Sequence, residues 1–599
     1  MTADADALYR AALNACEQGR IADGIALARS AIVDDAQHAQ AHRLLGMALL
    51  RVGDAAAALP CFERAIALGV SSAALHGACG DALAALQRPL DALASYDHAV
   101  KDGGSADDWC NRGVLLHELG RHADATESFD RALALDPDFT PAYYNRGIAL
   151  AAQGRHDDAV AAFDAAILRA PATAPAYNNR ALSLDQRGRG AEALASAEQA
   201  LAIDPQYRDA MVTLGILRRK MRRPEEALEP VERALALQPD DVDALLVKGD
   251  ALIDLERFDD AIQVFDRIMQ LDPAATAAPW NKSLICLGLG RFDAGWPLYG
   301  HRWKAQRSLI PRLYPQRPWD SGRLDGPLLV WGEQGLGDEI LHASMMADVT
   351  ARTGEVLFEC EPRLAPLFAR SFPQVTIVPV QDALYGGPVS AQIALGDLGA
   401  LFRKDWQAFP RRGRGYLVPD ETRRQQLRAR LAGTGSRVVG LSWISKAPTG
   451  GAQKSASLKD LMPLLRLPGL RFVDLQYGDT QAERDALARE TGIAVERLPD
   501  IDTMNDIDGL AALIAACDVV VTVSNTTAHL AGALGAETWV MVPNGQARIW
   551  YWFKDKPDSP WYPFARVRRQ RRGQSWSDVA AGVAGEVASL PLVRRTTPD

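Results

Sequence analysis

The fold of the first half of the chain is decided by a pattern that residues 141–171 show in full, PAYYNRGIALAAQGRHDDAVAAFDAAILRAP. Apolar residues recur at helical spacing in PAYYNRGIALAAQG and again in DDAVAAFDAAILRAP, and Gly154-Arg155 lies between the two runs. The small residue Ala159 permits close approach of two helices, and Pro171 ends the second one. The segment therefore predicts a pair of amphipathic helices.

This unit recurs every 34 residues. The turn recurs at Gly120-Arg121, Gly154-Arg155, Gly188-Arg189, Arg222-Arg223, Glu256-Arg257 and Gly290-Arg291. Upstream, Gly19, Gly53 and Gln87 keep the spacing, with one residue missing before Gly120. The pattern resembles the tetratricopeptide repeat over roughly residues 5–308, in about nine units. Such helix pairs cannot bury their apolar faces alone, so we expect an α-solenoid, a tetratricopeptide superhelix with a concave groove.

One repeat position suggests what the groove binds. Asparagine occupies it in four repeats, at Asn111, Asn145, Asn179 and Asn281. An amide side chain can both donate to and accept from an extended peptide backbone. The row resembles the asparagine ladder of O-GlcNAc transferases, which implies an acceptor groove for polypeptide. The alternative is that these amides only make hydrogen bonds between helices.

Composition and charge limit the partners and the compartment. The net charge of −9 over 599 residues gives no basic surface for nucleic acid. No apolar stretch reaches membrane-spanning length, and the N-terminus lacks a signal peptide pattern. The seven cysteines form no CxxC pair, which favours free thiols and argues against structural zinc. We expect a cytoplasmic protein with no membrane span.

The second half alternates short apolar runs with helical segments. One series of predicted strands lies at 327–332, 355–359, 375–379 and 391–395, and a second at 437–443, 470–475, 494–497, 518–523 and 538–542. Alternation of this kind predicts parallel sheets, and two series predict two Rossmann-like lobes. We expect the repeat domain at 1–308, a first lobe at 309–425 and a second at 426–599. Ligands of such sheets bind beyond the carboxyl ends of the strands.

The loop after the first predicted strand, WGEQGLGDE, contains Gly335, Gly337 and Asp338. Glycines let the backbone turn sharply beside a ligand, and a helix N-terminus presents unpaired N–H groups. Asp338 fits two interpretations. It is a favoured helix N-cap, and it is also a carboxylate able to deprotonate an acceptor hydroxyl.

Two further strand ends carry polar residues. The loop LSWISKAPTGGAQK after 437–443 contains Ser442, Lys446 and Lys454, and a lysine at a strand end suits a phosphate as well as a solvated surface. Gln476, in LQYGD at another strand end, is a candidate for holding the base or ribose of a nucleotide.

The third loop lies in VVVTVSNTTAHLAGALG, residues 519–535, where a strand runs directly into a helix. Its polar residues are Ser524, Asn525, Thr526, Thr527 and His529. A capped helix explains one of them, but hydroxyls and amides beside free N–H groups at the positive end of a helix also form an anion site. The chemistry suits a diphosphate.

Two features near the C-terminus are interpreted as structural. For Trp550 and Trp552 a packed aromatic cluster is favoured over stacking on a sugar or base. For the arginines at 566, 568, 569, 571 and 572 a solvated, charged face is favoured over a site for phosphate or an acidic partner.

GLGDEILHAS, KSASL, LQYGD, DIDGLAALIAACDVVVTVSNTTAHLAGALG and DSPWYP together resemble the heptosyltransferase-like glycosyltransferases (glycosyltransferase family 9) over roughly 326–590. They are most similar to a bacterial branch fused to tetratricopeptide repeats, which includes flagellin-modifying enzymes. The resemblance implies a GT-B fold, a nucleotide-sugar donor bound by the second lobe, and inverting transfer without a metal or other cofactor. It implies Asp338 as general base, Lys454 as a phosphate contact, and Ser524, Asn525, Thr526 and His529 as the diphosphate-binding turn.

Two departures from that family matter. Members usually carry Asp before Thr or Ser at the turn, where this chain has Ser524-Asn525, so a charge near the donor is absent. The predicted first lobe, of about 100 residues, is also short for the family. A trimmed acceptor lobe is consistent with repeats that recognise the acceptor, and also with an inactive enzyme.

We therefore expect a glycosyltransferase that moves a sugar to a Ser or Thr hydroxyl of a protein acceptor, with flagellin as the leading candidate. Two alternatives remain open. One is transfer to a lipid or polysaccharide intermediate. The other is a non-catalytic tetratricopeptide scaffold with a degenerate transferase domain.

Overall fold

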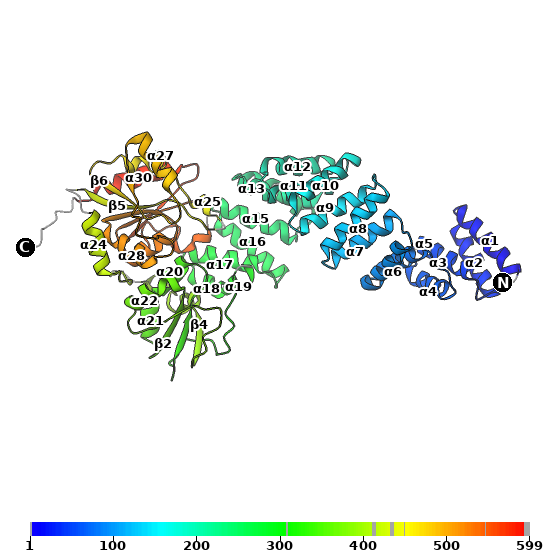
Figure 1. Ribbon diagram of the computed structural model, residues 1–599, viewed down its shortest axis with the longest axis horizontal. Helices are drawn as coiled ribbons and strands as arrows, with labels where there is room; N and C mark the ends of the chain where they lie inside the picture. The colour runs from blue at the N-terminus through cyan, green and yellow to red at the C-terminus, as the bar shows by residue number, and fades with distance from the viewer. Residues whose placement is uncertain are drawn as a thin grey trace, which may run out of the picture. The chain divides into compact units, whose positions relative to one another are not determined.

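The computed structural model describes residues 3–306, 309–409, 415–431, 436–447, 450–544 and 547–591. The chain folds into two compact units, Met1–Val247 and Lys248–Asp599. Helical repeats extend over residues 3–305, and a region with two parallel sheets follows them (Figure 1). This confirms the predicted order of a repeat solenoid followed by α/β lobes. The predicted end of the repeats at residue 308 lies outside the described residues.

The repeat helices are 8 to 15 residues long, apart from a short last helix. They are α1 (Ala3–Glu17), α2 (Ile21–Asp34), α3 (Ala39–Arg51), α4 (Ala55–Ala67), α5 (Ala73–Ala85), α6 (Pro89–Lys101), α7 (Ala106–Glu118), α8 (His122–Leu135), α9 (Thr140–Ala152), α10 (His156–Arg169), α11 (Ala174–Gln186), α12 (Gly190–Ile203), α13 (Arg208–Lys220), α14 (Pro224–Leu237), α15 (Val242–Asp254), α16 (Phe258–Leu271), α17 (Ala277–Gly288), α18 (Phe292–Tyr299) and α19 (Arg302–Ala305).

Within a repeat, the two helices approach closely because a glycine on the first faces a large side chain on the second. A Cβ atom added at Gly147 would lie 2.5 Å from Cε1 of Phe163. Equivalent pairs are Gly46–Phe62, Gly80–Tyr96, Gly113–Phe129, Gly215–Val231 and Gly249–Phe265. In α11 and α12 the corresponding residues are Ala181 and Ala197, both fully buried. Ala181 is larger than the glycine of the other repeats, and its partner Ala197 is smaller than their aromatic residue or valine.

The α/β region contains a four-stranded and a six-stranded parallel sheet. The first has the order β3-β2-β1-β4 and the second the order β10-β9-β8-β5-β6-β7. The strands are β1 (Leu328–Trp331), β2 (Val356–Cys360), β3 (Thr376–Pro379), β4 (Ala391–Ala394), β5 (Arg437–Ser442), β6 (Leu470–Asp474), β7 (Val495–Glu496), β8 (Val519–Val523), β9 (Thr538–Val542) and β10 (Ala565–Arg569). If β5 to β10 are numbered 1 to 6, the second order reads 6-5-4-1-2-3, which is the strand order of a doubly wound Rossmann sheet. Its change of direction lies between β5 and β8.

Helices cover both faces of the second sheet. Val519, Val521 and Val523 of β8 pack into one apolar cluster, whereas Val520 packs into another. The helices of the region are α20 (Leu336–Ala343), α21 (Met346–Thr350), α22 (Ala365–Ser371), α23 (Leu398–Phe402), α24 (Glu421–Leu431), α25 (Gly451–Lys454), α26 (Met462–Leu465), α27 (Gln481–Thr491), α28 (Ile507–Ala516), α29 (Thr526–Ala533) and α30 (Trp576–Ser589), with 3-10 turns η1 (Pro362–Leu364), η2 (Leu395–Asp397), η3 (Trp406–Ala408) and η4 (Ala547–Trp552). The predicted boundary between the lobes, at 425/426, falls inside α24.

The first three arginines of the segment near the C-terminus lie in a strand that was not predicted, whereas Arg571 and Arg572 beyond it are exposed, as expected of a solvated face. Ala565 and Val567 of β10 are buried, and β10 pairs with β9. At the alternate positions of the strand, Arg566 forms an ion pair with Glu537 and Arg568 forms one with Glu586. Because these arginines are neutralised by acidic neighbours, the strand tolerates them.

Among the described residues, no helix combines the length and apolarity that crossing a bilayer requires.

Gly147→Ala tests the repeat packing. A methyl group at this site overlaps the ring of Phe163, and overpacking of this kind costs about 1–3 kcal/mol of unfolding free energy. We expect a lower urea midpoint for the helical signal in circular dichroism. Gly190→Ala is the matched control, because nothing lies within 4 Å of the added Cβ. It should leave stability unchanged or raise it by up to about 1 kcal/mol. Equal effects of the two substitutions would contradict the packing explanation.

Candidate active site

A cavity of about 480 Å³ lies where the strands of both lobes end. It contains the glycine loop that follows β1 and the first turn of α29, which follows β8. The switch point of a doubly wound sheet is the usual position of a ligand. The lining residues are Gly335, Leu336, Gly337, Asp338, Arg363, Ser445, Lys446, Ala447, Lys454, Tyr477, Thr503, Met504, Ile507, Leu510, Ser524, Asn525, Thr526, Thr527, His529 and Tyr551. Of the donor-site and catalytic residues predicted from sequence, all except Ser442 and Gln476 lie here.

Asn525 caps α29 and ties two strands together. Its Oδ1 accepts from the backbone N–H of Ala528 at 3.3 Å and from the hydroxyl of Thr522 at 3.1 Å. Its Nδ2 donates to Oγ of Ser442 at 2.8 Å, across from β8 to the end of β5. Because both ends of the amide are engaged with protein, Asn525 shapes the cavity floor and fixes the start of the helix.

The first turn of α29 offers donors to the cavity. The first N–H groups of any helix lack intrahelical partners, and they carry the positive end of its dipole. Thr526 and Thr527 supply such groups here, and both line the cavity. The hydroxyl of Thr527 is fully buried and, among the described residues, has no hydrogen-bond partner. These groups suit an anion.

Asp338 is the third residue of α20, and the N-cap is Gly335. The interpretation of Asp338 as N-cap was therefore wrong. Its carboxylate instead accepts from the backbone N–H of Gly335. Burial raises the pKa of Asp338 to about 6, opposed by that hydrogen bond and by the positive charge of Lys454. At neutral pH the carboxylate is mostly ionised, and it is a stronger base than an ordinary aspartate.

His529 is a neutral side chain at the contact between the lobes. Burial lowers its pKa to about 3. Its Nδ1 lies 2.9 Å from the hydroxyl of Tyr562. That hydroxyl is in turn hydrogen-bonded to Tyr416. The hydroxyl of Tyr416 donates to the carbonyl of Ile340 at 2.5 Å, so it can only accept from Tyr562. This directional chain places the proton on Nδ1 and leaves Nε2 as an acceptor. A Cβ at Gly337 would lie 2.9 Å from Cδ2 of His529, so only glycine permits this approach of α20 to α29.

The described charged residues that line the cavity are three cations and one carboxylate. The cations are Lys446, Lys454 and Arg363, and the carboxylate is that of Asp338. Arg363 of the first lobe also donates to the carbonyl of Met504 in the second, at 2.9 Å. Because Arg363 is also paired with Glu361 at 2.7 Å, the positive charge offered to a phosphate group comes from Lys446 and Lys454.

Ser442 and Gln476 lie beneath the cavity and do not line it. Gln476 is fully buried, and its Oε1 accepts from Ser442, from the backbone N–H of Trp443 at 2.9 Å and from that of Ile444 at 2.8 Å. The two side chains hold the carboxyl end of β5. Ser524 lies on the wall, where it accepts from Nε1 of Trp552 at 2.8 Å. Trp552 and Trp550 are both buried among other aromatic rings, as predicted.

Several lining residues were missed from sequence. Arg363, Tyr477, Met504 and Tyr551 reach the cavity from four separate segments. Tyr477 follows Gln476 directly in LQYGD, so its position at a strand end was a usable signal. The other three stand in ordinary loop or helical sequence and are brought here only by tertiary packing.

In the repeats, each predicted groove asparagine donates to the preceding repeat. The bonds run from Asn111 to Asp81 at 3.2 Å, from Asn145 to Sγ of Cys110 at 3.7 Å, from Asn179 to Tyr144 at 3.0 Å and from Asn281 to Asp250 at 2.9 Å. These contacts are of the inter-helix kind considered above. Each amide retains an oxygen that can accept, and the groove role stays a prediction.

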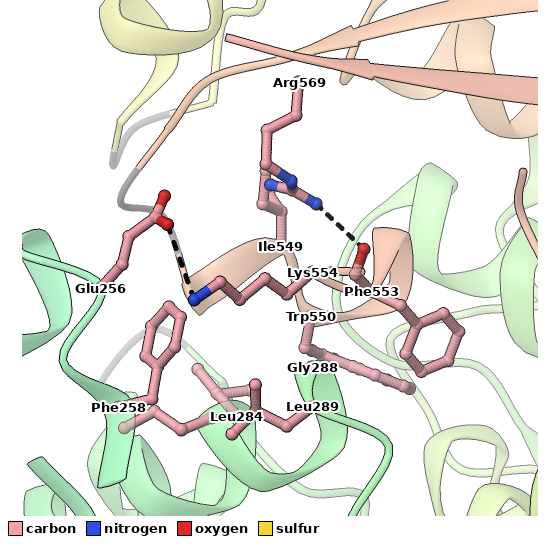
Figure 2. A pocket seen from close by; sticks show the side chains of 11 residues that line it. Glu256, Phe258, Leu284, Gly288, Leu289, Ile549, Trp550, Phe553, Lys554 and Arg569 are labelled. Carbon is pink, nitrogen blue, oxygen red and sulfur yellow. Dashed lines mark hydrogen bonds and ion pairs between the residues drawn. The ribbon is translucent and has the colours of Figure 1, made fainter. Parts of the chain in front are cut away.

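A second, smaller cavity lies where the last repeats meet the second lobe (Figure 2). Its wall is formed by α16, α17, η4 and β10. Nζ of Lys554 lies 3.6 Å from Glu256 and 4.5 Å from the ring centroid of Phe258. Arg569 donates to the carbonyl of Phe553 at 3.2 Å. At about 30 Å³ the space holds little more than a water molecule. We therefore interpret it as part of the packing contact between the last repeats and the second lobe, and not as a ligand site.

Comparison with known proteins defines the class of the first half. The tetratricopeptide repeat family matches at residues 9–73, 45–108, 106–139, 144–208 and 212–276. Over roughly its first 300 residues, the chain is a tetratricopeptide repeat protein, followed by an α/β region. It is 33% identical over 324 residues to protein FlbA of Caulobacter vibrioides. The match covers 50% of this chain and 53% of FlbA, so the chain spans about half the length of this relative.

Solved structures with similar chains include two repeat proteins. YrrB, described as a TPR protein with an unusual peptide-binding site, has 23% identity and a TM-score of 0.29 and covers 31% of this chain and 95% of its own. MamA of Desulfovibrio magneticus RS-1 has 22% identity and a TM-score of 0.27. The match covers 28% of this chain and 96% of the MamA chain.

The raised pKa of Asp338 predicts a pH-dependent gain in stability for Asp338→Asn. The folded pKa of about 6 exceeds the unfolded value of 3.8, so the native state holds its proton more tightly and loses stability as pH rises from about 4 to 7. Asparagine has no such loss. Since the side chain is only half-buried, we expect the variant to gain about 1 kcal/mol at pH 7 and nothing at pH 4.

Thermal unfolding at the two pH values measures this difference. Asp382→Asn, at an exposed site of the same lobe, is the control and should leave the melting temperature unchanged. An advantage of Asp338→Asn that is equal at pH 4 and pH 7 would show that burial of the charge is not its cause.

Proposed function

We propose that the protein is an inverting glycosyltransferase of GT-B type. It moves a sugar from a nucleotide-sugar donor to a Ser or Thr hydroxyl of a polypeptide that the repeats select. One observation carries the proposal: a base of raised pKa and a cationic, amide-rich helix tip share one cavity at the ends of two parallel sheets. The motif resemblance described above names the same residues.

The proposed step uses groups on opposite sides of the reacting carbon. Asp338 accepts the proton of the acceptor hydroxyl, and the oxygen attacks the anomeric carbon as the bond to the nucleotide phosphate breaks. The departing diphosphate, or monophosphate, gains negative charge, which Lys454 and the N–H groups of Thr526 and Thr527 stabilise. Attack from the side opposite the leaving group inverts the anomeric configuration. Because these side chains supply positive charge themselves, we expect transfer to continue in EDTA.

The remaining lining residues suggest how the donor lies. Tyr477, Met504 and Ile507 offer aromatic and apolar surface beside Lys446, whose Nζ lies 5.9 Å from the ring centroid of Tyr477. A nucleobase has flat faces that pack on such surface. In the proposed pose the base lies there, the phosphates lie at the tip of α29, and the sugar lies toward Asp338.

Asp338→Asn should remove transfer and retain donor binding. Loss of a general base lowers kcat by about 10²–10⁴-fold. Because the base must be ionised, wild-type kcat should fall below about pH 6, the pKa of this carboxyl. Full activity of Asp338→Asn with correctly folded protein would refute the assignment.

Lys454→Met tests the phosphate contact. Because it removes a positive charge from the cavity wall, it should weaken binding of nucleoside diphosphate, measured by calorimetry.

The acceptor role of the repeats is tested by removing three asparagines of the row. Asn111→Ala, Asn145→Ala and Asn179→Ala together should raise the KM for a polypeptide acceptor about tenfold or more, because each amide bond contributes about 0.5–1.5 kcal/mol. Flagellin is the first acceptor to try, followed by lipid and polysaccharide acceptors. Hydrolysis of the nucleotide sugar, which needs no acceptor, should not change.

The matched control replaces three exposed glutamines of the same unit, Gln37, Gln206 and Gln238, by alanine. It should leave the acceptor KM unchanged. If the asparagine variant modifies protein as well as the control does, the repeats do not select the acceptor through this row.

A further inference from the structure

The last repeat helix inserts a charged side chain into the first lobe. Arg302 of α19 is fully buried, at 0% exposure. Its Nε and Nη2 donate to the two carboxylate oxygens of Glu333, each at 2.7 Å, and its Nη1 lies 2.7 Å from Oδ1 of Asp397. This forked arrangement matches the guanidinium to the carboxylate in a way that lysine cannot reproduce.

The two acids mark a particular place in the first sheet. Glu333 follows the end of β1, and Asp397 follows the end of β4. In the order β3-β2-β1-β4 these strands are neighbours, and the chain changes direction between them. A ligand of this sheet would be expected in that crevice. Arg302 occupies it, so the repeats fill the binding position of the first lobe with a protein side chain.

Glu333 begins the loop that carries Asp338. Besides Arg302, its Oε1 accepts from the backbone N–H of Gly396 at 2.9 Å. The next residue, Gln334, has a positive φ of 64°, a conformation that a residue other than glycine adopts only when its surroundings impose it. Tyr299 of α18 lies beside it, with the hydroxyl 3.4 Å from Nε2 of Gln334. Two residues of the last repeat thus contact the turn four to five residues before Asp338.

The two helices that precede α19 are fastened to the lobes, α18 to the first and the end of α17 to the second. Nε1 of Trp296 donates to the carbonyl of Arg403 at 2.8 Å on the first-lobe side. On the second-lobe side, the backbone N–H of Lys554 donates to the carbonyl of Gly288 at 3.0 Å, next to the ion pair of Lys554 with Glu256 (Figure 2). Arg302 therefore acts from a rigid support.

We propose that Arg302 is a positioning residue of the transferase site, which holds the Glu333–Asp338 turn so that the carboxylate of Asp338 faces the cavity. The last repeat is then a component of the active site. This inference rests on the proposed function for its catalytic consequence, but the restraint on the turn can be measured without it.

The experiment uses the full chain with four variants. Arg302→Met leaves Glu333 buried without a partner and risks misfolding. The double variant Arg302→Met with Glu333→Gln removes both charges and keeps an acceptor for the N–H of Gly396. Arg302→Lys keeps the charge without the fork. Arg403→Met is the matched control, since Arg403 is equally buried but pairs with Asp348 at 2.9 Å.

Hydrogen exchange of residues 332–338 is the first measurement. In the double variant we expect exchange there about tenfold faster or more, with the strands of the first sheet unchanged, because the turn has lost its restraint. The control should exchange as wild type does. Unchanged exchange of the turn in the double variant would overturn the proposal, whether or not the protein proves to be a transferase.

Steady-state kinetics is the second measurement. We expect kcat of the double variant to fall about 100-fold while the donor KM changes less than about threefold, and Arg302→Lys to recover part of the loss. A kcat equal to wild type, together with faster exchange, would overturn the positioning role. If wild type itself transfers no sugar, the proposed function fails, and hydrogen exchange alone decides whether Arg302 restrains the turn.

Discussion

The C-terminal unit depends on the close approach of two helix starts, one from each lobe. Gly337 on α20 lies against His529 on α29, and a single added carbon there would meet the imidazole at 2.9 Å. This contact brings the Asp338 carboxylate within electrostatic reach of Lys454 and close to the donors of α29. Burial and the lysine act on the carboxyl in opposite directions, and burial prevails. The chemical character of the cavity is thus set by how tightly the two lobes meet.

The last repeats belong physically to the α/β region. Residues from Lys248 onward form one compact unit with both lobes. The aromatic residues Phe292, Trp296 and Tyr299 of α18 lie in the same apolar core as Trp550 and Trp552. A chain cut at the predicted repeat boundary would expose this surface and leave Glu333 without its arginine. The boundary between the two compact units therefore does not coincide with the end of the repeat pattern.

Much of the architecture was readable from sequence because it rests on local periodicity. The repeats follow from a 34-residue period, and strands β1 to β9 follow from apolar runs between turns. Strand β10 was missed because its alternate positions are arginines, whose neutralising partners Glu537 and Glu586 are distant in sequence.

At the candidate site, the loops were found because glycines and hydroxyls at strand ends are local signals. Long-range contacts were not accessible in this way. Arg302, Arg363 and Tyr551 stand in unremarkable sequence and gain their places only through folding. Gln476 was correctly placed at a strand end, but the direction of its side chain, into the protein, depends on the neighbouring strand. Residue type and strand position indicate where a site lies, whereas side-chain direction requires the packed structure.

The paired glycines and aromatic rings of the repeats restrict how these units can diverge. The absence of a side chain at Gly147 makes room for the large ring of Phe163. At the corresponding positions Ala181 and Ala197, both side chains are small and buried. A substitution at either member is tolerated only with a compensating change in its partner. Relatives of this chain should therefore show correlated replacement at these two positions, and a transplanted repeat should keep both residues from the same source.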